Sequence, residues 1–243
     1  RVLDAINATL KRFDHPWIQG YLEGAKAFHH YMEGDFQDSL TYATTSAGIF
    51  EEGRANYWER AQMNLLSLWS LFFLGEWERM TVIAKRNLSD ALDRGDLIAA
   101  SSNMLGLNNV VFLNLEGPDR TRKMVDDLMA QWGGDGYQLQ HWWYRLAHIQ
   151  IDYYLGDAGR ARERLAGEMS ILKKSLTLLV PSIRNQVALL QVRNLIEVAR
   201  QAPDPRKSPA LKAAWRGTRK LANRRYLWIQ ALTTVLQAEA QLL

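Results

Sequence analysis

Histidine and acidic side chains are the groups in this chain whose spacing could support metal chemistry. Five histidines are present, and His29 with Glu33 (i, i+4) or His141 with His148 (i, i+7) would share one face of a helix. Zinc, however, needs three or four converging ligands. The chain has no cysteine and no His-Glu-x-x-His motif to supply them. We therefore interpret the histidines as structural or surface residues and expect no metal site.

Nucleophilic and phosphate chemistry also lack their usual motifs. No serine stands in a Gly-x-Ser-x-Gly context. The Gly133-Gly134-Asp135-Gly136 loop does not follow the strand that a phosphate-cradling loop requires. Arg94-Gly95-Asp96 reads as a helix boundary, because Gly95 suits a left-handed C′ position and Asp96 an N-cap. The sequence therefore predicts neither an enzyme nor a cofactor site.

A basic segment near the end of the chain could bind an anionic partner. Between Pro203 and Arg225 eight Lys and Arg residues stand against Asp204 alone, a local charge of +7, while the rest of the chain carries −3. Four of them recur at helical spacing opposite apolar residues and form the basic face: Lys212, Arg216, Arg219 and Lys220. It could be a solvated face, a docking surface for an acidic part of the parent protein, or a nucleic-acid or anionic-membrane patch. We expect no nucleic-acid partner.

Helices must position all of these groups. One type of segment has a single apolar stripe and a charged opposite face, which predicts half-solvated helices over 36–50, 77–92, 121–132 and 158–172. A second type is apolar almost all round and must be packed between neighbours; it covers 58–74, 97–115 and 139–155. Further helices are expected over 181–200, 210–224 and 226–243. We therefore expect an all-α chain of about 11 or 12 helices without strands.

A glycine-containing phrase recurs between these helices. Its copies include Gly34, Gly75, Gly117 and Gly156, spaced 41, 42 and 39 residues apart. A period of about 40 residues is typical of an α-solenoid of stacked helical hairpins. We expect such an array over residues 1–202, a Pro-rich linker over 203–209 and a C-terminal helical hairpin that caps the array over 210–243.

Composition is that of an ordinary globular chain, with 47% hydrophobic and 23% charged residues. No apolar run reaches the roughly 18 to 20 residues of a membrane span, and no segment resembles a signal peptide. With no cysteine to form disulfides, we expect a cytoplasmic protein. The chain begins at Arg1, already inside the apolar pattern of Val2, Leu3, Ile6, Leu10 and Phe13. We expect it to be a piece of a longer polypeptide.

The recurring Gly-Asp-aromatic-x-x-small phrase resembles the turn of a tetratricopeptide (TPR) repeat, although the period exceeds the usual value of about 34. Over roughly residues 57–199 the chain is similar to the C-terminal helical-repeat region of large multidomain bacterial Ser/Thr protein kinases. This similarity lies in the strings YWERAQMNLLSLWSLFFLGEW, DRGDLIAASSNMLGLN, GYQLQHWWYRLAHIQIDYYLGD and LKKSLTLLVPSIRNQVALLQVR. It implies a regulatory array, since no kinase motif is present.

The TPR resemblance also implies which residues face the concave side of the array. Counting back from the turn glycines gives mainly aromatic and apolar residues where peptide-gripping arrays carry Lys, Arg and Asn. The candidate groove comprises Tyr21, Phe28, Tyr31, Trp69, Phe72, His141, Trp143, Gln150 and Tyr153. Two interpretations stay open. The rings could be core because the superhelix is tight or plugged by its terminal helices, or they could line an apolar groove for an amphipathic helix or a small ligand.

The repeat pattern and the absence of catalytic motifs predict a non-catalytic interaction module, and the resemblance implies a regulatory role within a larger bacterial signalling protein. Its partner would be another protein or another domain of the same polypeptide. The alternative is a small-molecule or peptide sensor that binds an effector in the concave groove, as in the TPR-like arrays of ATP-dependent transcriptional activators.

Overall fold

The chain is all-helical. A computed structural model describes residues 4, 8, 15–52, 57–133 and 136–243. This described part contains 11 α-helices, is 86% helical and has no strand. The prediction of an all-α chain is therefore confirmed. The apolar pattern of Val2, Leu3, Ile6, Leu10 and Phe13 lies outside the described residues, as do Gly134 and Asp135 of the glycine-rich loop.

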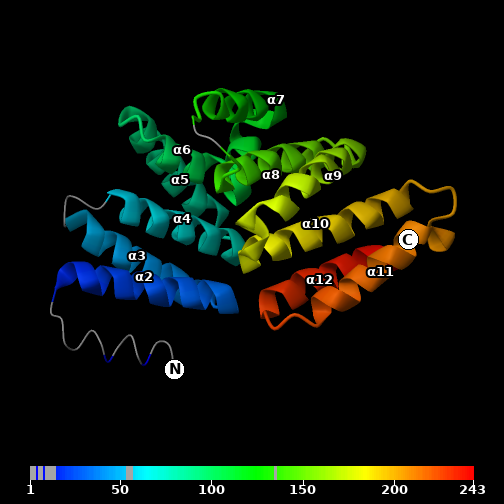
Figure 1. The fold of residues 1–243 in the computed structure, drawn as a ribbon, viewed down its shortest axis with the longest axis horizontal. Coiled ribbons are helices and arrows are strands. Elements are labelled where there is room, and N and C mark those ends of the chain that lie inside the picture. The colour runs from blue at the N-terminus through cyan, green and yellow to red at the C-terminus, as the bar shows by residue number, and fades with distance from the viewer. Residues whose placement is uncertain (1–3, 5–7, 9–14, 53–56, 134–135) are drawn as a thin grey trace. The chain divides into compact units, whose positions relative to one another are not determined.

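The chain divides into two compact units, residues 1–133 and residues 134–243. Unit 1 contains α2 (Pro16–Glu33), α3 (Phe36–Glu52), α4 (Tyr57–Leu74), α5 (Trp77–Asp93), α6 (Leu97–Met104), the 3₁₀ helix η1 (Gly106–Asn108) and α7 (Asn109–Met129). Each of these α-helices packs against the next, and α2 also contacts α4 (Figure 1).

Small residues let α2 approach α3 closely. A Cβ atom on Gly20 would lie 2.8 Å from Cε1 of Phe50, so the ring of Phe50 occupies the space that a side chain would need. The hydroxyl of Ser46 donates a hydrogen bond to the carbonyl of Gly20 at 2.7 Å. Because interiors are close-packed, these positions fix how α2 and α3 meet.

The recurring glycines end helices as the sequence predicts. Gly34, Gly75, Gly117 and Gly156 all have positive φ, between 74° and 97°, where a residue without a Cβ atom is favoured. Gly95 also has positive φ (66°). Asp96 caps α6 by accepting a hydrogen bond from the amide of Ala99 at 2.9 Å. The interpretation of this triplet as a helix boundary is confirmed.

The single helix predicted over 97–115 is wrong. Leu105 is extended (ψ 178°) and separates α6 from η1 and α7. Gly106 has a positive φ of 65°, and the side chain of Asn108 donates to the carbonyl of Ser102 at 2.8 Å. The side-chain amide of Asn108 thus donates to the carbonyl of Ser102, which in an uninterrupted helix would accept from a backbone N–H. α7 is itself interrupted at Gly117 (φ 76°, ψ 171°), where the sequence predicts a turn.

Unit 2 contains α8 (Leu139–Tyr154), α9 (Ala158–Lys174), the 3₁₀ helix η2 (Leu176–Leu179), α10 (Pro181–Arg200), the 3₁₀ helix η3 (Pro205–Lys207), α11 (Pro209–Ala222) and α12 (Leu227–Gln241). α10 packs against α9, α11 and α12 (Figure 1). Side chains connect α8 to α10, since the indole of Trp142 donates to Gln186 at 3.4 Å. The division of the chain at residues 203–209 stays a prediction.

Two of the helices that are apolar all round are enclosed as expected. In α4 no residue from Glu59 to Leu74 is exposed, and in α8 only Tyr154, its last residue, is exposed. Within the described part of the chain no helix combines the length and apolarity needed to cross a membrane.

Candidate functional site

Helix α2 of unit 1 carries aromatic side chains on its surface. Tyr21 and Phe28 of the candidate groove are 43% and 52% exposed, and Trp17 is 44% exposed. Positions 17, 21 and 28 fall on one face of a helix with 3.6 residues per turn. We call these three residues the aromatic stripe. Trp17 was missed by sequence reasoning, although its i, i+4 spacing to Tyr21 could have signalled it.

Contacts hold Tyr21 in a defined orientation. Its ring packs edge-on against Trp17 and Phe50, with ring centroids 4.8 and 5.3 Å away. Its hydroxyl donates a hydrogen bond to Oε1 of Glu59 on α4 at 2.6 Å. This bond to a carboxylate is the main reason why the pKa of Tyr21 is raised. The stripe therefore presents a positioned ring rather than a loose one.

The other groove residues of unit 1 are less accessible. Tyr31 is only 2% exposed and belongs to a core cluster against which Trp69 and Phe73 pack. Burial raises the pKa of Tyr31. Phe72 is partly buried, with ring centroids 5.2 Å from those of Phe73 and Trp77. Of the aromatic residues predicted for this face, Tyr21 and Phe28 therefore lie at the surface and Tyr31 lies in the core.

In unit 2 the groove residues make internal contacts. Trp143 is 6% exposed and Gln150 is partly buried. His141 belongs to the capping box of α8, where its Nδ1 accepts a hydrogen bond from the amide of Gln138 at 3.0 Å. The hydroxyl of Tyr153 donates to Asn194 of α10.

The ring of Tyr153 also makes a cation–π contact with Arg193. The guanidinium of Arg193 lies 4.2 Å from its ring centroid. Burial, the largest effect, raises the pKa of Tyr153 to about 12. The polar groups of His141 and Tyr153 thus serve helix capping and packing within unit 2.

The basic face lies on α11 as the sequence predicts. Its members Lys212, Arg216, Arg219 and Lys220 are all exposed, while Leu211, Ala214, Thr218 and Leu221 are buried on the opposite side. None of the four basic side chains makes an ion pair with a described residue. Its amphipathic character is confirmed, and its binding role stays a prediction.

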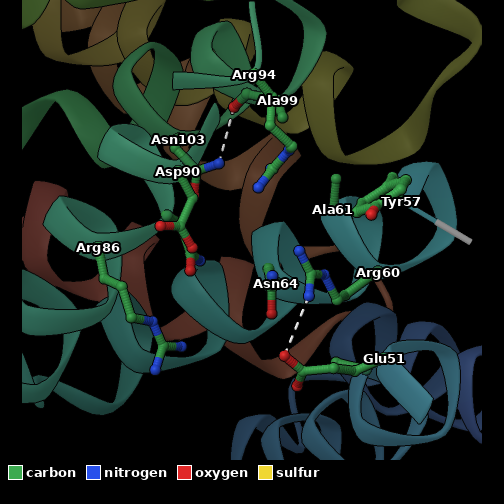
Figure 2. Close-up of a pocket in the computed structure, with 12 residues that line it drawn as sticks. Glu51, Tyr57, Arg60, Ala61, Asn64, Arg86, Asp90, Arg94, Ala99 and Asn103 are labelled. Atoms are coloured by element: carbon green, nitrogen blue, oxygen red, sulfur yellow. Dashed lines mark hydrogen bonds and ion pairs between the residues drawn. The ribbon is translucent and has the colours of Figure 1, made fainter. Parts of the chain in front are cut away.

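A pocket that sequence reasoning missed lies within unit 1 among α3, α4, α5 and α6. Its volume is about 190 Å³. Its lining is mostly polar and comprises Ala47, Glu51, Tyr57, Arg60, Ala61, Asn64, Arg86, Asn87, Asp90, Arg94, Ala99 and Asn103. We call it the polar pocket (Figure 2).

Arginine side chains frame this pocket. Arg60 pairs with Glu51 at 3.1 Å, and the guanidinium groups of Arg60 and Arg94 lie 5.6 and 5.5 Å from the ring centroid of Tyr57. Figure 2 shows Arg60 and Arg94 reaching toward the same space from different helices. The exposed side chain of Arg86 has no ion-pair partner among the described residues.

Two buried amides complete the pocket. Asn87 and Asn103 are 7% and 2% exposed. The Nδ2 of Asn87 and the Oδ1 of Asn103 have no hydrogen-bond partner among the described residues. Buried polar atoms without partners are uncommon in folded proteins.

The lining residues of the pocket define which functional groups it offers to a ligand. It contains guanidinium, amide and carboxylate groups but no serine, histidine or lysine among its lining residues. Across the described residues, no group of three His, Cys, Asp or Glu side chains could hold a metal ion.

No protein-family model, curated protein or solved structure matches the chain.

Proposed function

We propose that this chain is a non-catalytic interaction and regulatory module, built as a TPR-like array of helical hairpins within a larger bacterial signalling protein. The parent that the resemblance implies is a Ser/Thr kinase. The partner would be another protein or another domain of the same polypeptide. The observation that carries the proposal is the aromatic stripe of Trp17, Tyr21 and Phe28, each exposed by more than two fifths.

Aromatic side chains suit such a surface for two reasons. They are enriched in protein interfaces and among the few residues that carry most of the binding energy. A ring that is already oriented loses little conformational entropy on binding, and the hydrogen bond from Tyr21 to Glu59 provides this orientation. An amphipathic helix that lays its apolar face along α2 is the occupant that this stripe fits.

The basic face supports a different kind of contact and gives the proposal a clear alternative. Binding through aromatic burial should depend weakly on salt, because apolar burial is not screened. Binding through exposed lysines and arginines should weaken steeply as salt rises. An effector in the concave groove is the weaker candidate, because Tyr31 and Trp143 are buried.

The test begins with the open reading frame that encodes the chain. The remaining segments of that polypeptide are expressed and their binding to the 243-residue chain is measured at low and high salt. Phe28→Ser should weaken binding about tenfold or more, as expected for an interface anchor. Tyr154→Ser, which changes another exposed aromatic residue (62%) in unit 2, is the matched control.

Two outcomes would contradict the proposal. Binding that Phe28→Ser leaves unchanged would exclude the aromatic stripe. Binding that is steeply salt-dependent, and that is lost when Lys212, Arg216 and Lys220 are all changed to Glu, would assign the function to the basic face instead.

A further inference from the structure

We propose that the polar pocket of unit 1 binds a small organic acid that carries a hydrogen-bond donor beside its carboxylate, such as a 2-hydroxy acid. This inference does not depend on the interaction function proposed above, because none of the three stripe residues lines the pocket. Three features of the pocket support it: its charge, its unpartnered buried amides and its size.

The charges of the pocket leave one positive charge in excess. Glu51 pairs with Arg60 at 3.1 Å. Of the remaining charged lining residues, Arg86 and Arg94 are cationic and Asp90 is anionic. A carboxylate would balance this excess. The planar fork of a guanidinium group also matches a carboxylate in geometry, because two parallel N–H···O bonds can form.

Contacts with Tyr57 orient two of the guanidinium groups. Arg94 comes from the end of α5 and Arg60 from the first turns of α4, and both lie beside the same ring. Figure 2 shows both side chains extending toward the space that Asn64 and Asp90 also border. A carboxylate entering this space would meet donors that are already arranged, which lowers the entropic cost of binding.

The unpartnered amides are independent evidence for a ligand. Asn103 donates its Nδ2 to the carbonyl of Ala99 at 2.8 Å, which fixes the orientation of the amide and leaves Oδ1 free to accept. Asn87 leaves Nδ2 free to donate. Buried groups of this kind destabilise a protein unless something satisfies them. A ligand with both an acceptor and a donor would satisfy both, and for this reason we specify an acid that also carries a donor.

The size of the pocket limits the ligand. A protein cavity of about 150 Å³ accepts benzene, and the polar pocket measures about 190 Å³. A ligand of roughly six to ten non-hydrogen atoms follows from this comparison. Small hydroxy acids fall within that range, whereas nucleotides and hexose phosphates exceed it.

Isothermal titration calorimetry with the 243-residue chain tests the inference. The probes are L-lactate against propionate and L-malate against succinate, pairs whose members differ by one hydroxyl group. We expect the hydroxy acid of at least one pair to bind about tenfold more tightly than its partner, the effect of one well-placed hydrogen bond. Arg94→Ala and Arg86→Ala should each weaken that binding about tenfold.

The matched control is Lys85→Ala. Lys85 is exposed, neighbours Arg86 on α5 and does not line the pocket, so its removal takes away one positive charge without touching the site. It should leave the affinity within about twofold. Thermal melting of each variant reports whether it folds. If Arg94→Ala lowers the melting temperature, Arg86→Ala, whose side chain is exposed, decides the question.

Three results would overturn the inference. The first is the absence of binding by all four acids at millimolar concentration. The second is equal affinity within both pairs, because the buried amides would then have no part in recognition. The third is an equal loss of affinity in Lys85→Ala and Arg86→Ala, which would indicate attraction to the overall charge of α5 rather than a site.

Discussion

Gly217 of α11 lies directly against Val192 of α10. A Cβ atom on Gly217 would stand 2.6 Å from Cγ2 of Val192, closer than non-bonded carbon atoms approach in folded proteins. The β-branched side chain of Val192 is stiff about χ1 and cannot easily turn away. This contact therefore sets the spacing between α10 and the terminal hairpin of α11 and α12.

We expect Gly217→Ala to destabilise unit 2 by about 1 to 2 kcal/mol, because overpacking should outweigh the better helix propensity of alanine. Gly167→Ala in α9 is the matched control. A Cβ atom there meets no atom within 4 Å, so this change should stabilise by about 0.5 to 1 kcal/mol. Chemical denaturation of the full chain measures the change in the free energy of unfolding for both variants. Changes of the same sign would contradict the prediction that Gly217 has no room for a Cβ atom.

Arg164 should stabilise the folded chain because it forms an ion pair with the buried carboxylate of Asp152. Its Nε donates to Oδ2 of Asp152 at 2.5 Å, and the Asp152 side chain is 1% exposed. Removing the partner of a buried charge is costly, so Arg164→Met should lower the free energy of unfolding by about 3 kcal/mol.

Arg160→Met, at an exposed position about one turn earlier on α9, provides the comparison and should change stability by less than about 0.5 kcal/mol. Equal effects of the two substitutions in urea denaturation would show that the Asp152 pair contributes nothing.

Substitution of Trp69 tests whether the aromatic residues around it in unit 1 form a packed core or an open groove. It packs against the cluster around Tyr31, with ring centroids 5.7 Å apart. Trp69 is partly buried in this packing, and Trp69→Ala should cost about 3 to 5 kcal/mol, the range for large aromatic residues removed from a core. Trp58→Ala on the same helix removes a ring that is 58% exposed and should cost less than about 0.5 kcal/mol. A cost below about 1 kcal/mol for Trp69 would favour a ligand groove.

Most helix ends could be predicted because their signals are local. The turn glycines and the Asp96 cap act within a few residues, and Pro181 begins α10 where its fixed φ favours a helix start. The break at Leu105 was missed because it lies inside an apolar run. Gly106 and Asn108 were the only local signals, and the bond from Asn108 to Ser102 forms only in the folded chain.

The polar pocket could not be predicted for a different reason. Arg86 and Asp90 of α5 and its C-cap residue Arg94 stand four residues apart, a pattern that indicates a solvated helix face. Only the packing of α3, α4 and α6 around that face encloses it. The contacts of the groove residues in unit 2 could not be predicted either. The Asn194 that accepts the hydrogen bond of Tyr153 is 41 residues away in sequence.

Tyr153 should make stability depend on alkaline pH. Its pKa is about 12 in the folded chain, against about 10 for an unperturbed tyrosine. A raised folded-state pKa means that its contribution is fully present below pH ~10 and is lost as the pH rises toward ~12. At neutral pH, Tyr153→Phe should cost about 1 kcal/mol through loss of the hydrogen bond to Asn194. Above pH ~10 the difference in melting temperature between wild type and Tyr153→Phe should shrink, because phenylalanine cannot ionise. A difference that stays constant across this range would show that Tyr153 ionises equally well in the folded and unfolded chain, and that burial between α8 and α10 does not protect it.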